Sequence, residues 1–214
     1  MDPFILAAHV QPEGVKKIID IGCGCGIMPL ILAFRYPWLQ VTGVEIQEEL
    51  YKFAKKNIIA SRLNKTIHII REDIKKVKIS DIKGKADIII SNPPYKKKDS
   101  GRLNPDSQKA IARHEITLDI DLLFNCSNKL LKGQGRIYII FPAQRLNDLM
   151  LAMAHYEFTP DHIRFVYIKK NTKAKRIILC AVKKKDRTCV IRPPLYIYAS
   201  ENKFTDEYAS MFKP

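Results

Sequence analysis

The sequence lacks the features that would place it outside the globular class. None of its apolar runs approaches the roughly 18 residues that a membrane span needs, and no low-complexity tract or internal repeat divides the chain. Its first residues carry no basic segment of the kind that begins a secretory signal, so we expect a cytoplasmic protein. With 214 residues, 46% of them hydrophobic, the chain is long enough for one well-buried core. We therefore expect a single domain over residues 1–214.

Cysteine is scarce and scattered. The five cysteines form no Cys-x-x-Cys pair, and the Cys23-x-Cys25 spacing does not suit a metal site. We predict small buried thiols in a reducing compartment, with no disulfide framework and no bound metal.

Acidic residues are outnumbered by basic ones. The 37 lysines and arginines exceed the 22 aspartates and glutamates, which gives a formal net charge of +15. Such a surplus favours a polyanionic partner such as nucleic acid, because each neutralised phosphate releases counterions. The alternative is a lysine-biased composition in which the charges are solvated surface groups, so charge supports a nucleic-acid partner without deciding it.

Apolar runs alternate with segments of helical period, the pattern of βαβ units around a mostly parallel sheet. We expect strands over residues 17–22, 40–45, 66–70, from 86 onward and over 136–141, and helices over 27–35, 47–62, 107–131 and 144–155. Residues 161–168 and 175–183 predict a hairpin, which makes the final strand antiparallel, and the tail from residue 192 is expected on the surface. The apolar stripes predicted to face the sheet are Ile27, Leu30, Ile31 and Phe34 in one helix and Leu50, Phe53, Ala54 and Ile58 in the next.

The first apolar run ends in a glycine-rich turn. Asp20 is followed by Gly22, Gly24 and Gly26, and such glycines let a ligand approach the N–H groups at the start of a helix. A dinucleotide fold requires Gly-x-Gly-x-x-Gly, but residue 27 is isoleucine. We therefore expect a ligand without a pyrophosphate, whose cationic amino-acid end lies over the turn.

Acidic residues end the next two strands. Glu45 follows the turn at the distance of one βα unit and is positioned to accept hydrogen bonds from two ribose hydroxyls. Asp73 is expected to accept from an adenine amino group, although Glu72 is equally placed. Ile46 and Ile74 complete the predicted cofactor-binding set, with Ile74 beside the adenine ring.

The second apolar run ends in Asn92-Pro93-Pro94-Tyr95. An amino nitrogen on adenine is a poor nucleophile because its lone pair is delocalised into the ring. Two acceptors aimed at its N–H bonds localise that lone pair, and the Asn92 side-chain oxygen and the Pro93 carbonyl are the expected pair. Tyr95 is expected to stack on the base, a contact worth about 1–3 kcal/mol. A base inside a helix cannot reach such a pocket, so the target is expected to be flipped out.

The two motifs are expected to face one crevice, because ligands bind beyond the carboxyl ends of the strands in an open α/β sheet. In that arrangement Asn92 also contacts the cofactor. A pocket for an adenosyl ligand beside two acceptors for a planar amine suits methyl transfer from S-adenosylmethionine. Positioning and fixed dipoles supply most of the rate, so no strong general base is required.

These residues resemble a known family. Asp20 to Gly26, Glu45 and Asn92 to Tyr95 are similar to the motifs of class I, Rossmann-like methyltransferases that modify amino nitrogens. Residues 2–8, 112–115 and 193–198 resemble the bacterial tRNA(Val) adenine N6-methyltransferases, which methylate the adenosine beside the anticodon. The resemblance implies the Rossmann-like methyltransferase fold, S-adenosylmethionine as cofactor and RNA as partner. Family members usually carry a further amino-terminal stretch before the segment that matches residues 2–6.

Basic residues near the second motif are expected to contact RNA. The stretch 96–106 is expected to form a mobile loop over the crevice. The predicted phosphate contacts are Lys96, Lys97, Lys98, Arg102 and Arg113. A second basic group, on the predicted hairpin, consists of Lys169, Lys170, Lys173, Lys175 and Arg176.

Other functions share parts of this pattern. Methylation of a glutamine amide in a release factor also uses Asn-Pro-Pro-Tyr, but those enzymes carry a helical amino-terminal domain, and the positive charge here suits RNA better. Methylation of guanine in ribosomal RNA more often has phenylalanine after the prolines. A non-catalytic RNA-binding module is disfavoured by the intact glycine turn and Asn92. We expect a monomer.

Overall fold

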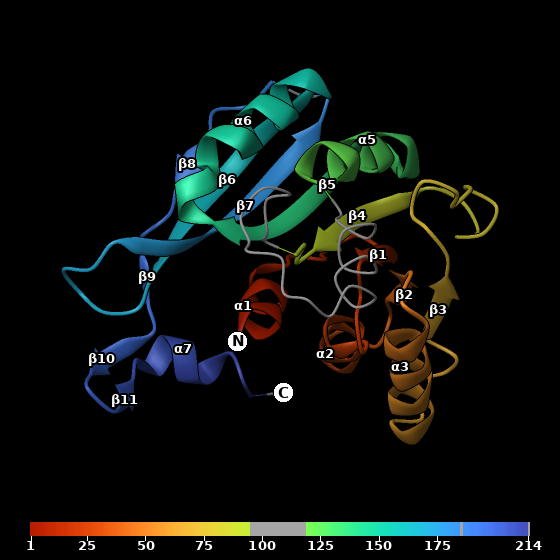
Figure 1. Cartoon of the computed structure of the whole chain (residues 1–214), viewed down its shortest axis with the longest axis horizontal. Coiled ribbons are helices and arrows are strands. Elements are labelled where there is room, and N and C mark those ends of the chain that lie inside the picture. The colour runs from red at the N-terminus through yellow and green to blue at the C-terminus, as the bar shows by residue number, and fades with distance from the viewer. Residues whose placement is uncertain (95–118, 185, 214) are drawn as a thin grey trace, which may run out of the picture.

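A nine-stranded sheet forms the centre of the molecule (Figure 1). The computed structural model describes residues 1–94, 119–184 and 186–213. The strands lie in the order β3-β2-β1-β4-β5-β7-β6-β8, with β9 also paired to β6. Their bounds are β1 Lys17–Ile21, β2 Gln40–Glu45, β3 Ile67–Arg71, β4 Ala86–Ser91, β5 Leu131–Pro142, β6 Phe158–Tyr167, β7 Ala174–Lys183, β8 Val190–Ile191 and β9 Leu195–Tyr196. A separate small hairpin consists of β10 Tyr198–Ser200 and β11 Lys203–Phe204.

Helices cover both faces of the sheet. On one face α1 (Asp2–His9), α2 (Ile27–Arg35), α3 (Glu48–Ala60) and α7 (Asp206–Ser210) contribute buried side chains to one core cluster. On the other face α5 (Ile120–Leu130) and α6 (Leu146–His155) contribute to a second cluster, and a short 3₁₀ turn, Ala143–Arg145, precedes α6. Within the described residues, no helix is long and apolar enough to cross a membrane.

The central strands are buried on both sides, which explains their continuous apolar runs. In β1, Ile18 packs into the first cluster and Ile19 into the second. β1 pairs in parallel with β2 and with β4, so that Asp20 is opposite both Gly43 and Ile90. The carboxyl ends of β1, β2, β3 and β4 therefore meet at one edge of the sheet.

The antiparallel strand is β7, which lies between β5 and β6 rather than at the edge of the sheet. The five strands from β3 to β5 are mutually parallel. This arrangement confirms the predicted α/β, Rossmann-like fold with a mostly parallel sheet and an antiparallel final long strand.

Most predicted elements are present within three residues of their expected bounds, the largest of these differences being the start of β6 at Phe158 instead of residue 161. The exception is the region around residue 131, where a helix was expected to continue to 131 and a strand to begin at 136. Instead α5 ends at Leu130 and β5 begins at once at Leu131. The prediction failed because Lys132-Gly133 was taken as a helix end with a loop after it. The first part of that helix, and the predicted loop 96–106, lie outside the described residues.

Two predicted core residues and one cysteine are exposed. Phe34 is 59% exposed because α2 buries Met28, Leu32 and Ala33, a face rotated towards α1. Phe53 is 53% exposed, since α3 packs through Ala54 and Ile58. All five cysteines are free thiols, but Cys25 lies on the outer side of the glycine turn and is exposed.

The tail contributes more to the core than predicted. Leu195, Ile197, Tyr208 and Met211 are buried in the first cluster. Thr205 caps α7 by accepting a hydrogen bond from the Tyr208 amide through its hydroxyl. The polar composition of this segment concealed the four buried side chains.

Gly43 lies where β2 passes closest to the glycine turn. A Cβ atom at this position would meet Ile69 Cδ1 at 2.6 Å and Cys23 Sγ at 2.7 Å. We expect Gly43→Ala to lower the free energy of unfolding by about 1–3 kcal/mol, the usual cost of overpacking. Chemical denaturation measures this change. Gly133→Ala is the matched control, because no atom lies within 4 Å of its added Cβ, and equal effects of the two substitutions would refute the packing argument.

Candidate active site

The glycine turn after β1 is held against the end of β2. The backbone N–H groups of Gly22 and Cys23 donate to the Val44 carbonyl at 2.9 and 3.1 Å. Gly22, Gly24 and Gly26 have φ values of 75°, 56° and 84°, in the left-handed region that favours glycine. At Gly26 an added Cβ would also meet Ala54 Cβ at 3.3 Å, so α2 and α3 approach closely there. The turn is therefore fixed before any ligand binds.

Glu45 connects two turns through its carboxylate. Its Oε2 accepts the Gly24 N–H at 2.8 Å, and its Oε1 accepts the Gln47 N–H at 2.9 Å. The side chain is only 4% exposed, yet it lines a cavity. Each carboxylate oxygen has a further lone pair, so Glu45 can still accept hydrogen bonds from two ligand hydroxyls.

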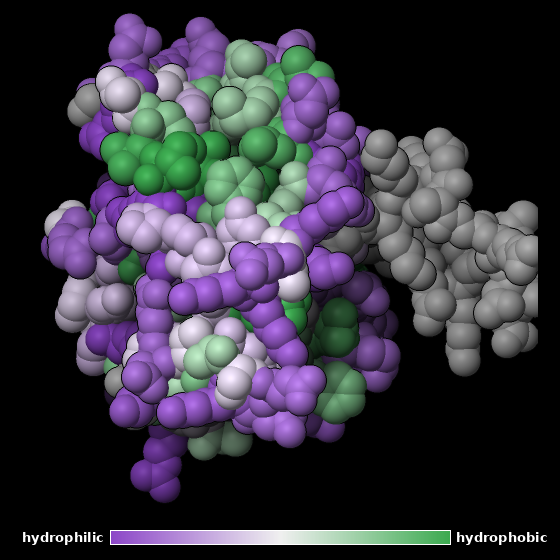
Figure 2. All heavy atoms as spheres, turned by 90° about the vertical axis from the view of Figure 1, so that its left-hand side faces the viewer, coloured by the Kyte–Doolittle hydropathy of each residue, from purple (hydrophilic) through white to green (hydrophobic). Residues whose placement is uncertain are grey.

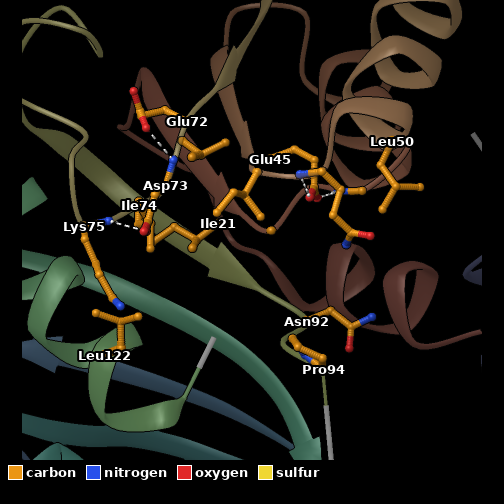
Figure 3. A pocket seen from close by; sticks show the side chains of 15 residues that line it. Ile21, Glu45, Leu50, Glu72, Asp73, Ile74, Lys75, Asn92, Pro94 and Leu122 are labelled. Atoms are coloured by element: carbon orange, nitrogen blue, oxygen red, sulfur yellow. Dashed lines mark hydrogen bonds between the residues drawn. The ribbon is translucent and has the colours of Figure 1, made fainter. Parts of the chain in front are cut away.

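The cavity has a volume of about 260 Å³ and lies beyond the carboxyl ends of β1 to β4 (Figure 3). Gly24 and Asn92 both line it, which confirms the expectation that the glycine turn and the Asn-Pro-Pro motif face one crevice. Nothing lies within 4 Å of a Cβ built on Gly24, so the turn is open to a ligand. The lining residues are Ile21, Gly22, Gly24, Val44, Glu45, Ile46, Gln47, Leu50, Glu72, Asp73, Ile74, Lys75, Asn92, Pro94 and Leu122.

Several predicted residues do not line the cavity. Asp20 is completely buried behind the turn, Gly26 is the N-cap residue before α2, and Pro93 is buried next to Asn92. The other predicted residues that the structure describes line the cavity: Gly22, Gly24, Glu45, Ile46, Asp73, Ile74 and Asn92. Outside the described residues are Tyr95, Lys96, Lys97, Lys98, Arg102 and Arg113.

Sequence reasoning missed some of the lining. Most missed residues, such as Gln47 and Lys75, are chain neighbours of predicted ones, so extending each motif by two residues would have included them. Leu50 and Leu122 come from α3 and α5. Their positions depend on how these helices pack, and no short motif signals that.

Asp73 and Glu72 differ in orientation. The Asp73 Oδ1 accepts the Lys75 N–H at 3.0 Å, while the Glu72 Oε1 accepts the Asp73 N–H at 2.8 Å. In Figure 3 Asp73 lies beside Ile74 on the side of Ile21, and the Glu72 carboxylate extends away from them. This geometry favours Asp73 as the acceptor for an adenine amino group.

Asp20 is a buried acid behind the turn. Its carboxylate oxygens have no hydrogen-bond partner among the residues that the structure describes. Burial raises the pKa of Asp20 well above its usual value, and the nearby Glu45 charge raises it further. The buried position therefore favours the protonated form of Asp20 more than an exposed position would.

A group of potential metal ligands lies elsewhere, at the β5-β7-β6 side of the sheet. Donor atoms of Asp161, His162 and Cys180 lie within 4.8 Å of one another. Asp161 is already ion-paired with Arg187, and its Oδ2 lies 2.9 Å from His162 Nδ1. Because the acid has both partners, we interpret the group as an ion-pair cluster, and the absence of a resident metal stays a prediction.

The comparisons with known proteins agree with this geometry. The model of the family described as "Methyltransferase small domain" matches residues 4–153. The chain belongs to this family. It is an S-adenosylmethionine-dependent methyltransferase, as the two motifs predicted. A tRNA1(Val) (adenine(37)-N6)-methyltransferase from Porphyromonas gingivalis is 33% identical over 223 residues, which cover 100% of this chain and 86% of the relative.

Solved structures share the fold. A predicted O-methyltransferase from Agrobacterium tumefaciens has a TM-score of 0.78 and 18% identity, covering 99% of this chain and 95% of that chain. An O-methyltransferase of a polyketide synthase from Brevibacillus brevis, in complex with S-adenosyl-L-homocysteine, has a TM-score of 0.60 and 16% identity, covering 84% and 70%. These likenesses concern the fold alone.

The cavity residues fit S-adenosylmethionine. The open glycine turn leaves space for the amino-acid end, and Glu45 offers acceptors to the ribose. Ile46, Ile74 and Leu122 provide apolar surface for a flat ring, with Asp73 at its edge. When bound, this cofactor would supply a methyl group on a positively charged sulfur. A suitably held nucleophile would bond to the methyl carbon in line with the carbon–sulfur bond, and the sulfur would leave as a neutral thioether.

The buried Asp20 makes stability depend on pH. Because its pKa is raised in the folded state, the folded protein keeps a proton that the unfolded chain loses above pH 3.8. Stability therefore falls as pH rises through the window above that value. We expect Asp20→Asn, which cannot titrate, to gain stability relative to the wild type with rising pH, by at most about 1.4 kcal/mol per pH unit.

Urea denaturation at a series of pH values measures this difference. Asp186→Asn, at an exposed position, is the control for loss of a carboxylate at the surface. If the wild type and Asp20→Asn gave parallel curves above pH 4, Asp20 would be shown to titrate as an ordinary acid.

Proposed function

We propose that the protein methylates the exocyclic N6 nitrogen of adenine in the anticodon loop of a tRNA. The observation that carries the proposal is the shared cavity, which brings Asn92 to the edge of the cofactor site. The curated relatives that match the full length of the chain are named for methylation of adenine 37 at N6 in tRNA1(Val). These names favour adenine over the glutamine and guanine alternatives.

Asn92 and Pro93 would hold the target amine. Asn92 follows β4 directly and is partly buried, while Pro93 is buried. The Asn92 side-chain oxygen and the Pro93 carbonyl would each accept one N–H of the adenine amine, which localises the nitrogen lone pair towards the methyl group. A proline at 93 keeps Asn92 extended at the strand end. The proton leaves the nitrogen after methylation has made it more acidic.

The apolar walls would exclude water from the reacting groups. Pro94 lies beside Asn92, and Leu122 lines the cavity further away, next to Lys75 (Figure 3). Tyr95 is proposed to stack on the base, and Lys96 to Lys98, Arg102 and Arg113 to contact phosphates. We propose a monomer that acts on tRNA in the cytoplasm.

Asn92→Ala separates methyl transfer from cofactor binding. We expect turnover on unmodified tRNA to be lost, because one of the two acceptors for the amine is removed, while affinity for S-adenosylmethionine changes only a few-fold. Mass spectrometry of nucleosides from the treated tRNA measures N6-methyladenosine, and calorimetry measures cofactor binding. NAD should give no heat of binding.

Two variants make this test specific. Glu45→Gln should lose cofactor affinity by about tenfold or more, because an amide NH₂ group would face a backbone N–H that now donates to the carboxylate. Asn64→Ala, at an exposed site, should behave as the wild type. Loss of cofactor binding in Asn92→Ala would refute the role proposed for Asn92, and methylated guanine in the product would refute adenine as the target.

A further inference from the structure

The connection between β6 and β7 carries an unpaired group of lysines. We define the basic hairpin as residues 167–175, with Lys169, Lys170, Lys173 and Lys175. Lys170, Lys173 and Lys175 are exposed, and Lys169 is partly exposed. Across the described ranges, no carboxylate forms an ion pair with any of these four lysines, whereas nearby Arg176 is paired with Asp2. Four positive charges are therefore available to a partner.

The basic hairpin lies at the same edge of the sheet as the active site. Ser91, at the end of β4, is opposite Ile139 of β5, and Pro142, three residues further along β5, is opposite Arg176 of β7. At about 3.3 Å per residue, the hairpin begins about 10 Å beyond the level of Ser91 along the strand direction. Across the sheet, β7 is two strands away from β4, which is a separation of about 10 Å. Figure 1 shows this connection projecting from the side of the sheet. A polymer bound in the cavity can reach it.

The carboxyl-terminal segment braces the hairpin from one side. β9 pairs with the end of β6, Leu195 with Val166 and Tyr196 with Tyr167. The pairing continues beyond β9, because the Ile197 N–H donates to the Tyr167 carbonyl and the Tyr198 N–H to the Ile168 carbonyl, both at 2.9 Å.

Burial and an arginine hold this segment in place. Leu195 and Ile197 are buried in the core, and Arg164 Nε donates to the Pro193 carbonyl at 2.8 Å. The motif at residues 193–198 does not line the cavity. It fixes the hairpin before a partner binds. A fixed surface loses less entropy on binding than a flexible one.

Tyrosine rings lie at the base of the hairpin. The rings of Tyr167 and Tyr196 are 5.5 Å apart with an interplanar angle of 38°, and both residues are partly exposed. Aromatic faces beside lysines suit a nucleic acid, because bases or riboses stack on the rings while phosphates meet the ammonium groups. Figure 2 shows a broad hydrophilic surface on this side of the molecule, below a hydrophobic band.

We propose that the basic hairpin and the pair Tyr167–Tyr196 form the surface that docks the body of the tRNA, away from the flipped nucleotide. This proposal rests on the proposed function, since it assigns a partner surface to the same substrate. The hairpin contributes binding energy and orientation, whereas Asn92 and the cavity act on the reacting nucleotide.

The test removes charge from the hairpin without touching the cavity. The variant Lys170→Ala, Lys173→Ala, Lys175→Ala should bind tRNA about tenfold or more weakly at low salt, and the slope of log affinity against log salt should fall by about 1 for each lysine that contacts a phosphate. The KM for tRNA should rise, with kcat and S-adenosylmethionine affinity unchanged. A thermal melt checks that the surface variant is folded.

A matched control loses the same charge elsewhere. Lys55, Lys56 and Lys65 are exposed on or just after α3 and form no ion pair in the described part of the chain. Their triple alanine variant should keep nearly all of the wild-type affinity and salt slope. Equal losses of tRNA affinity in the two variants would show a non-specific charge effect and overturn the docking surface. The docking surface would also be overturned if the hairpin were required for binding to phosphatidylserine vesicles and the protein did not bind tRNA.

Binding and methylation are read separately. If the wild-type protein binds tRNA through the hairpin but forms no N6-methyladenosine, the docking surface is supported and the proposed function fails. If the wild type methylates tRNA and the hairpin variant keeps the wild-type KM and salt slope, the proposed function is supported and the docking surface is overturned.

Discussion

The site depends on one carboxylate that joins the ends of two strands. Glu45 accepts the Gly24 N–H from the turn after β1 and the Gln47 N–H from the turn before α3. In a nearly buried position these charge-assisted hydrogen bonds are stronger than neutral ones, so they hold both turns at fixed positions. The same charge disfavours ionisation of Asp20 behind it. Glu45 therefore both fixes the two turns and places a carboxylate in the cavity that they line.

Local sequence patterns predicted most of the fold and the centre of the site. Strands buried on both faces give continuous apolar runs, and the positions of Glu45 and Asn92 at strand ends follow from those runs. Patterns failed where the outcome depends on contacts between distant segments. The buried face of α2 is rotated by packing against α1, which exposed Phe34, and Leu122 reaches the cavity from α5.

The carboxyl-terminal third illustrates the same limit. Its polar composition indicated a surface tail, yet alternate residues of the 193–198 segment are buried beside β6. A two-residue strand such as β9 has too few residues to show a period, so only the pairing with β6 reveals that Leu195 and Ile197 face inward. The cavity residues, between 21 and 122, and the basic hairpin, residues 167–175, thus come from separate stretches of the chain that are joined through the sheet.

The insertion of β7 between β5 and β6 also constrains how the chain acquires its structure. β5 is paired on one side with β4, but its other neighbour is made only when residue 183 has been synthesised. Until then the nascent protein presents β5, twelve residues long and largely apolar, as an open sheet edge that invites pairing with other chains. β6 is synthesised before β7, but it joins the sheet only when β7 has paired with both β5 and β6. Long-range pairing of this kind slows folding, so the edge of β5 stays open for longer than a hairpin edge would.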